Sequence, residues 1–148
     1  MRKLTVFICL IATLTLSAQT TKIKITFTGV KNEDGVIRIA LYNGVDAYRA
    51  REAAKTLVVQ SEKGEVNCSF DSVPIGKYIL AAYHDENGDA KLNTGTFGIP
   101  KEGYVFSNNA KAVMGPPNSE EMLFEIKEEK VSVLSLEMQY FDFKIFER

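Results

Sequence analysis

Hydrophobic and polar side chains alternate every second residue along most of this chain, and this period constrains its fold more than any other feature. Ile23, Ile25 and Phe27 fall on one side of a strand predicted over residues 22–28, and residues 36–42 repeat the pattern. Successive side chains of a β-strand point to opposite faces, so the period predicts strands that each bury one face. Because stretches with helical spacing are rare, we expect a chain built almost entirely of strands.

About seven short strands are expected in total. The other stretches with strand character are residues 56–60, 65–70, 77–84, 123–127 and 131–140. Residues 77–84 are apolar on both faces, which is typical of a central strand that is covered on both sides.

Short polar turns are expected to join neighbouring strands into hairpins. Asp34 and Gly35 end the turn between residues 22–28 and 36–42, and residues 61–64 separate the next two strands. An Asp-Gly pair between two alternating stretches favours a tight antiparallel hairpin.

Strands joined by hairpins predict an all-β domain of two antiparallel layers, a β-sandwich. One short helix of one or two turns is expected from Asp46, which suits an N-cap, through Ala54. No repeat or linker divides residues 19–148, so we expect a single domain there, with one long ordered loop.

The first 18 residues have the pattern of a secretory signal peptide. Arg2 and Lys3 precede an apolar run over residues 4–16, which ends in two small residues. A helix needs about 20 apolar residues to cross a bilayer, so this run is too short to be an anchor. We expect cleavage after Ala18, no membrane span in the mature protein, and export to the periplasm or out of the cell.

The composition argues against nucleic-acid binding and against an enzyme. Without residues 1–18 the formal net charge changes from −1 to −3, and Lys and Arg form no stripe for a polyanion. His84 is the only histidine, which excludes a metal site built from several imidazoles. A Cys68–His84 pair is disfavoured, because Cys68 alternates with Val66 and Phe70 on a buried face, where a thiol is inert.

The stretch at the end of the predicted central strand and after it, residues 84–124, is too long and irregular for a plain turn. Loops of this length are often either functional or disordered. The aromatic and aliphatic residues in this one favour an ordered loop folded over the sheet, since their burial contributes about 1.5 to 3 kcal/mol each.

Oxygen-bearing side chains stand at alternate positions at the start of this loop. Calcium binds six to eight oxygens, and the candidate ligands are Asp85, Asn87, Asp89 and Asn93. Ala90 and Thr96 stand where the helix-loop-helix calcium motif has glycine and glutamate. The alternative is a turn around Asn87 in which the carboxylates accept hydrogen bonds from amides of the loop itself. Calcium is therefore a possible cofactor and no other is expected.

Several runs of this sequence resemble an exported bacterial family called domain of unknown function 2141. The runs are PIGKY at residues 74–78, HDENG at 84–88, GIPKEGY at 98–104, FSNN at 106–109 and GPP at 115–117. The resemblance covers nearly the whole chain after residue 18, and it implies an exported β-sandwich of the prealbumin-like or immunoglobulin-like kind with an unassigned biochemical role. The family usually continues the acidic loop as Asn-Gly-Asn-Gly and ends it in aspartate, whereas this chain has Asp89-Ala90 and Asn93.

Two kinds of function are left open by these residues. The first is a binding module for a glycan, a peptide or an envelope protein, with the loop over residues 85–109 as the recognition surface. Its candidate ligand-binding residues are His84, Tyr104, Phe106, Asn108 and Asn109. The alternative for the last four is that they only cap the sheet, and the alternative for His84 is a strand-end residue whose ring anchors the following loop. The second kind is a small-ligand carrier or an enzyme with a pocket between this loop and the sheet, formed by His84, Asp85 and Tyr104.

Overall fold

The computed structural model describes residues 19–95, 98–112, 115–128 and 131–141. The predicted signal peptide and Thr96 lie outside these residues. The described residues form eight strands with short helical segments between them. They are β1 (Thr20–Val30), β2 (Val36–Tyr42), α1 (Gly44–Ala50), β3 (Lys55–Gln60), β4 (Gly64–Pro74), β5 (Gly76–Asp85), β6 (Tyr104–Phe106), the 3-10 turn η2 (Ser107–Asn109), α2 (Ser119–Met122), β7 (Phe124–Ile126) and β8 (Val131–Glu137).

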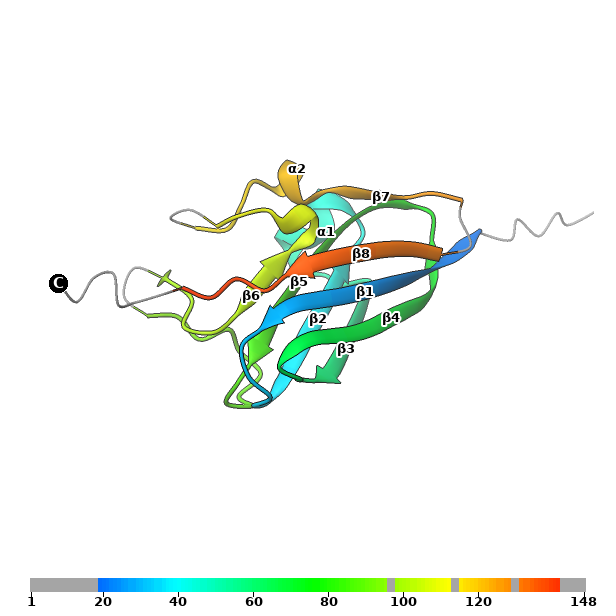
Figure 1. Ribbon diagram of the computed structural model, residues 1–148. Helices are drawn as coiled ribbons and strands as arrows, with labels where there is room; N and C mark the ends of the chain where they lie inside the picture. The colour runs from blue at the N-terminus through cyan, green and yellow to red at the C-terminus, as the bar shows by residue number, and fades with distance from the viewer. Residues whose placement is uncertain (1–18, 96–97, 113–114, 129–130, 142–148) are drawn as a thin grey trace, which may run out of the picture.

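The strands form two sheets that face each other, which confirms the predicted all-β sandwich (Figure 1). The first sheet has the strand order β4-β1-β8, and the second has the order β3-β2-β5-β6, with β7 also paired to β5. The strand predicted to be central, residues 77–84, lies within β5, which pairs with β2 on one side and with β6 and β7 on the other.

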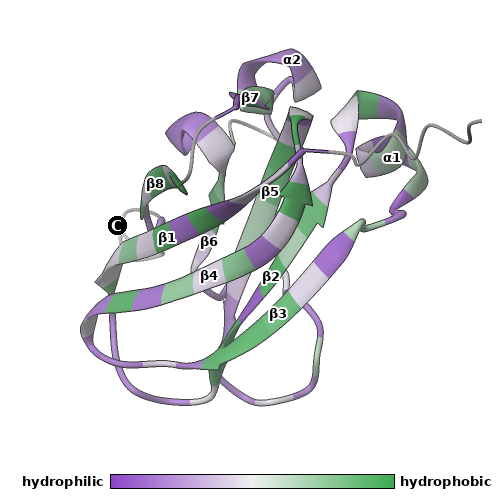
Figure 2. Cartoon of the chain, turned by 90° about the vertical axis from the view of Figure 1, so that its right-hand side faces the viewer, coloured by the Kyte–Doolittle hydropathy of each residue, from purple (hydrophilic) through white to green (hydrophobic). Residues whose placement is uncertain are grey.

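The core lies between the two sheets and is filled by every second residue of their strands. Ile23 and Phe27 of β1 are completely buried, as are Ile37 and Leu41 of β2. Figure 2 shows the corresponding alternation of apolar and polar residues along β1 and β4. The alternation of hydrophobic residues therefore predicted correctly which side chains face the core.

The two predicted hairpins are wrong. β1 pairs with β4 and β8, whereas β2 pairs with β3 and β5, so each supposed hairpin joins strands of different sheets. The turns carry the chain from one layer to the other. Gly35 serves this crossing: its φ is +63°, and a Cβ atom there would lie 1.9 Å from the carbonyl oxygen of Asp85. The glycine is required by close contact with the end of β5, and not by a hairpin.

The last strand departs from the antiparallel prediction. β8 runs parallel to β1, with Lys22 paired to Val131 and Thr28 paired to Glu137. The chain leaves β7 in the second sheet and returns to the first sheet at the start of β1, so a parallel pair results. β8 ends at Glu137, three residues before the predicted end, although Gln139 still forms a bridge with Tyr104.

The short helix begins earlier than predicted. α1 spans Gly44–Ala50, so Asn43 occupies the N-cap position, and Asp46 lies in the first turn. An acidic side chain is favourable there because it faces the positive end of the helix. The prediction of Asp46 as the cap was therefore wrong. The helix also ends before the predicted Ala54, because its C-cap Arg51 has a left-handed φ of 60°.

Candidate functional site

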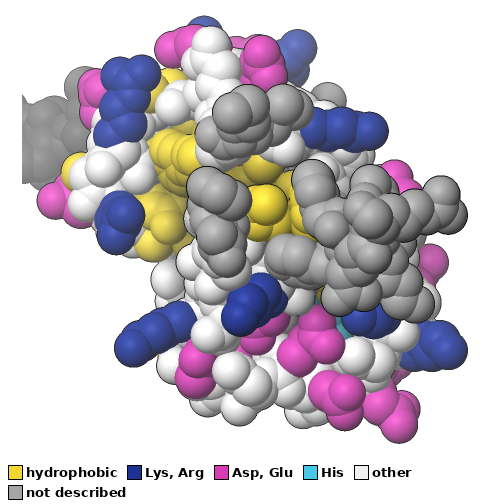
Figure 3. Space-filling view, turned by 90° about the vertical axis from the view of Figure 1, so that its left-hand side faces the viewer, with side chains coloured by type: hydrophobic (Ala, Val, Ile, Leu, Met, Phe, Trp, Pro, Cys, Tyr) yellow, Lys and Arg dark blue, Asp and Glu magenta, His cyan; other side chains and the backbone are white. Residues whose placement is uncertain are grey.

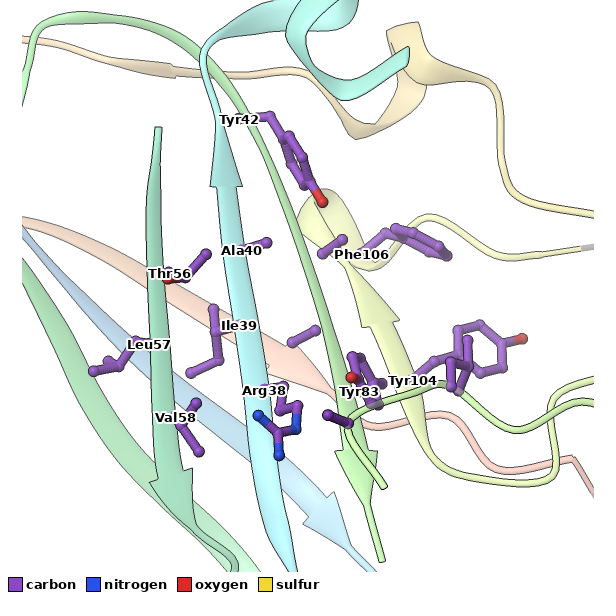
Figure 4. Close-up of a pocket in the computed structure, with 14 residues that line it drawn as sticks. Arg38, Ile39, Ala40, Tyr42, Thr56, Leu57, Val58, Tyr83, Tyr104 and Phe106 are labelled. Carbon is purple, nitrogen blue, oxygen red and sulfur yellow. The ribbon is translucent and has the colours of Figure 1, made fainter. Parts of the chain in front are cut away.

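A hollow of about 420 Å³ lies on the outer face of the second sheet (Figure 4). Its floor is made by Ala40 of β2 and Ala81 of β5, which are directly paired across the two strands. Both alanines alternate with core residues and therefore face away from the first sheet. Because a methyl group is short, these two positions leave a depression in the middle of the sheet. We call this hollow the groove.

Larger side chains stand at both ends of the groove. Figure 4 shows Tyr42 and Phe106 at one end and Arg38, Tyr83 and Tyr104 at the other. Phe106 is paired with the floor residue Ala81, so it lies on the same face. The ring of Tyr42 is held in place by an edge-to-face contact with Tyr48 of α1, with ring centroids 5.3 Å apart.

Two further segments border the groove. On one side β3 contributes Thr56 and Val58, and the Val58 side chain is 51% exposed. The loop that follows β5 contributes Ala90 and Leu92. The groove thus lies between the sheet and the loop, the place where a carrier pocket was predicted, and its surface is largely apolar.

An ion pair holds this loop against the sheet. The Nε of Arg38 donates to the carboxylate of Asp85 at 2.6 Å, and Asp85 is completely buried. The same carboxylate accepts hydrogen bonds from the backbone N–H of Asp89 at 3.1 Å and of Ala90 at 3.0 Å. Burial by itself raises the pKa of Asp85, but the hydrogen bonds from Arg38 and Ala90 outweigh it, so the pKa lies below its usual value. The ionised carboxylate therefore organises the start of the loop.

The four predicted calcium ligands lie together in this loop, and their polar groups bond to each other and to the loop backbone. Asp89 accepts from the Lys91 N–H at 2.9 Å and from the Asn93 side-chain amide at 3.0 Å. Asn87 accepts from the Asp89 N–H at 3.1 Å. Hydrogen bonds from Asn93 and Lys91 lower the pKa of Asp89. These contacts have the geometry of the alternative turn. In the described part of the chain no group of three or more His, Cys, Asp or Glu residues could hold a metal ion, and calcium binding stays a prediction.

Glu102 completes this loop and was missed in the sequence. Its side chain is 6% exposed, and its carboxylate accepts from the Glu86 N–H at 3.1 Å and from the Asn93 N–H at 2.8 Å. The segment before β6 is thereby tied to the segment after β5. Sixteen residues separate Glu102 from Glu86, so no local pattern indicated the contact.

His84 lies on the opposite face of β5 from Asp85, inside the sandwich, and is completely buried. Its Nε2 donates to the carbonyl oxygen of Asp34 at 2.7 Å, and its Nδ1 is 2.8 Å from the hydroxyl of Tyr140. That hydroxyl accepts from the Lys31 N–H at 3.1 Å. His84 therefore anchors the crossing between β1 and β2. It does not converge with Asp85 and Tyr104 on one site.

Cys68 also lies away from the groove, on β4 of the other sheet. Its side chain is half-buried against the core, and burial raises the pKa of its thiol to about 11. The thiol is therefore protonated at neutral pH and has little nucleophilic character.

The two asparagines predicted to bind a ligand are joined to the backbone of other elements. The side-chain amide of Asn108 donates to the carbonyl oxygens of Glu121 and Leu123, both at 2.9 Å. Asn109 accepts from the Glu137 N–H at 2.8 Å and donates to the Ser135 carbonyl oxygen at 3.2 Å. Both residues have positive φ angles, which asparagine tolerates better than most residues. Their contacts fit the alternative role of capping the sheet.

A family model described as an uncharacterized protein conserved in bacteria (DUF2141) matches residues 25–133. The chain belongs to the DUF2141 family. This match confirms the resemblance found in the sequence, and it runs from β1 to β8, so it includes both sheets and the groove. No curated protein and no solved structure matches the chain.

The runs that resemble DUF2141 lie mainly around β5 and the loop beside the groove. PIGKY opens β5, HDENG ends β5 and starts the loop, and FSNN leads from β6 into η2. The floor alanines, Ala40 and Ala81, lie outside these runs and were missed. Their signal was present in the alternation. Ala40 is the small residue at the outward-facing positions before Tyr42, and Ala81 is the small residue at those before Tyr83. In the described residues of this DUF2141 protein no helix has the length and apolarity needed to cross a membrane.

Proposed function

We propose that this DUF2141 protein is an exported, non-catalytic binding module that holds a small, largely apolar molecule in the groove. The observation that carries the proposal is the floor of two paired alanines between aromatic side chains on an outer sheet face. The same arrangement supports the small-ligand carrier that was the alternative prediction.

The size and surface of the groove support a small apolar ligand. Ligand pockets have volumes of about 300 to 1,000 Å³ and are lined mainly by apolar and aromatic side chains, and the groove has about 420 Å³. A ring or chain placed on Ala40 and Ala81 contacts Tyr42 and Phe106 from the side. Each 100 Å² of apolar surface removed from water contributes about 2.5 kcal/mol before the costs of binding are subtracted.

The polar contacts nearby favour this ligand over a sugar or a peptide. Amide and carboxylate side chains supply donors and acceptors that the hydroxyls of a glycan can bond to. The amides of Asn108 and Asn109 already donate to backbone carbonyls, and the Asp85 carboxylate already accepts from Arg38 and two backbone N–H groups. The predicted glycan, peptide and envelope-protein partners stay predictions.

Export is supported by the first 18 residues, with their basic start, short apolar run and small residues at the end. The test is expression of the full chain in a Gram-negative host, followed by fractionation and intact-mass measurement. We expect the periplasmic protein to begin at Gln19. Full-length protein retained in the cytoplasm would contradict export and leave the groove unaffected.

Binding can be tested with the fluorescent probe N-phenyl-1-naphthylamine and the chain over residues 19–148, which includes every described element. Ala81→Leu adds three carbon atoms to the floor of the groove without entering the core. We expect it to weaken probe binding at least about tenfold, a change of about 1.4 kcal/mol. Ser69→Leu is the matched control, since Ser69 faces outward on β4 of the other sheet. Equal affinity of the original chain and Ala81→Leu would exclude the groove as the site.

A further inference from the structure

We infer that the ligand of this protein is an elongated amphiphile, an apolar chain that ends in a carboxylate, and that its acidic end binds at Arg51. This inference rests on the proposed function and extends it, because it assigns a second binding region next to the groove and a chemical class to the ligand.

A second hollow of about 440 Å³ adjoins the groove. The two hollows share Leu92, Tyr104 and Phe106 as lining residues. The rings of Tyr104 and Phe106 lie next to each other, with centroids 6.0 Å apart. A ligand that lies in the groove can therefore continue past this aromatic pair into the second hollow, and the combined site is longer than either part.

The second hollow is as apolar as the groove. Its lining includes Ile99, Pro100, Pro116 and Phe141, and Phe141 is 39% exposed. Figure 3 shows hydrophobic side chains gathered in a band across one end of the molecule, with acidic and basic side chains around them. An exposed apolar surface with a polar rim is typical of a binding site. An apolar chain fits this surface better than a polar ligand does.

The charges that line the two hollows have one sign. Among the described lining residues no side chain is acidic, and the charged ones are Arg38 in the groove and Arg51 in the second hollow. Arg38 is neutralised by Asp85. Arg51 is exposed and takes part in none of the ion pairs between described residues. Its positive charge, which no described acidic side chain pairs, is complementary to an acidic group.

The backbone of Arg51 is held in place at the end of α1. Its N–H donates to the carbonyl oxygen of Tyr48 at 3.1 Å, and the next N–H, of Glu52, donates to Ala47 at 2.9 Å. The guanidinium group thus starts from a defined position at the border of the second hollow. A guanidinium donates two parallel hydrogen bonds to a carboxylate, which suits it to the end group of a fatty acid.

The experiment is displacement of N-phenyl-1-naphthylamine from residues 19–148 by hexanoate, by dodecanoate and by the uncharged dodecanol. We expect dodecanoate to bind at least about tenfold more tightly than hexanoate, because only the longer chain reaches both hollows. Arg51→Gln is expected to weaken dodecanoate about tenfold and to leave dodecanol and the probe unchanged.

Arg49→Gln is the matched control. Arg49 lies in the last turn of α1, is exposed, and is not among the residues that line either hollow. The Arg49→Gln substitution removes the same charge from the same end of α1 but not from a hollow, so we expect no change in dodecanoate binding. Equal losses in both variants, or no loss in Arg51→Gln, would overturn the assignment of the acidic end.

The outcomes separate this inference from the proposed function. If the probe fails to bind, the proposed function fails. If the probe binds and dodecanoate has no advantage over hexanoate and dodecanol, only the inference fails.

The alternative occupant of the second hollow is the chain's own end, DFKIFER at residues 142–148, which follows Phe141 directly in the sequence. Dodecanoate binding by a chain that ends at Phe141, with none by residues 19–148, would assign the second hollow to that segment and overturn the inference.

Discussion

The two outer faces of this sandwich differ in chemistry although the same kind of strand builds both. The outer face of the β4-β1-β8 sheet carries Lys22, Thr26, Asn67 and Asp71, and these residues bond to one another: Lys22 to Asp71 at 3.0 Å and Thr26 to Asn67 at 2.7 Å. Val131 and Val133 on its edge strand β8 are exposed apolar exceptions. The face with the groove carries alanines and aromatic residues instead.

This difference shows that the sandwich does not require an apolar outer face. An antiparallel sheet with one solvated face normally has polar residues there, and the first sheet follows that rule. The second sheet departs from it only around Ala40 and Ala81. Apolar residues that the fold does not need, gathered in one hollow, support the proposed binding function.

The largest difference between the two faces is expected from their ion pairs. Arg38→Met removes the partner of a completely buried carboxylate, whereas Lys22→Met removes the partner of an exposed one. We expect the melting temperature to fall by about 10 °C in Arg38→Met and by no more than about 2 °C in Lys22→Met. Thermal unfolding monitored by circular dichroism measures both. Similar small shifts would contradict the role of Asp85 in organising the loop.

Asparagines near the two faces give the next largest difference. Asn108→Ala loses two hydrogen bonds to carbonyl oxygens and places alanine at a φ of 59°, so the free energy of unfolding should fall by about 1 to 2 kcal/mol. Asn67→Ala on the polar face should change it by about 0.5 kcal/mol or less. Urea titration measures both values. Weaker probe binding by Asn108→Ala, at a temperature where this variant stays folded, would support the original prediction that Asn108 binds the ligand.

The pH dependence of stability tests the buried carboxylate directly. The pKa of Asp85 is lower in the folded protein than in the unfolded chain, where it is about 3.9. Its stabilising contribution is therefore complete above about pH 4 and is lost as the pH falls through the lower folded pKa. Urea titrations between pH 2 and pH 6 should show a shallower acid dependence in Asp85→Asn than in the original chain. The same slope in both would contradict the prediction.

Calcium should have the smallest effect. The oxygens of Asp85, Asn87 and Asp89 already accept hydrogen bonds from the loop. We expect millimolar calcium to raise the melting temperature by no more than about 1 °C, because a ligand stabilises only the state that it binds. A larger rise that a chelator reverses would establish the calcium site and replace the hydrogen-bonded turn.

The sequence predicted the buried faces of the strands but not how the strands assemble. Ile25 and Ile39 face the core as the alternation indicated, since period two depends only on local geometry. The sheet in which each strand lies depends on contacts between distant residues. Gly35 was predicted to be a hairpin glycine. Its actual role, which is to allow close contact with the end of β5, depends on a residue 50 positions away.

For the candidate site too, the sequence predicted the local features and not those that depend on contacts between distant residues. The loop after β5 was identified from its length and composition, and Tyr104 and Phe106 do line the groove. The floor of the groove was not predicted, because Ala40 and Ala81 form a hollow only when β2 and β5 are paired. His84 was a candidate for both kinds of site, yet it faces the core because neighbours on a strand face opposite sides and Asp85 faces outward.

The most direct test of the binding face is an NMR titration of ¹⁵N-labelled residues 19–148 with N-phenyl-1-naphthylamine. We predict that amide signals of Ala40, Ala81 and Phe106 shift with a single saturable dependence on probe concentration, while those of Thr26 and Asn67 stay unchanged. Equal shifts on both outer faces, or shifts confined to the β4-β1-β8 sheet, would contradict the account.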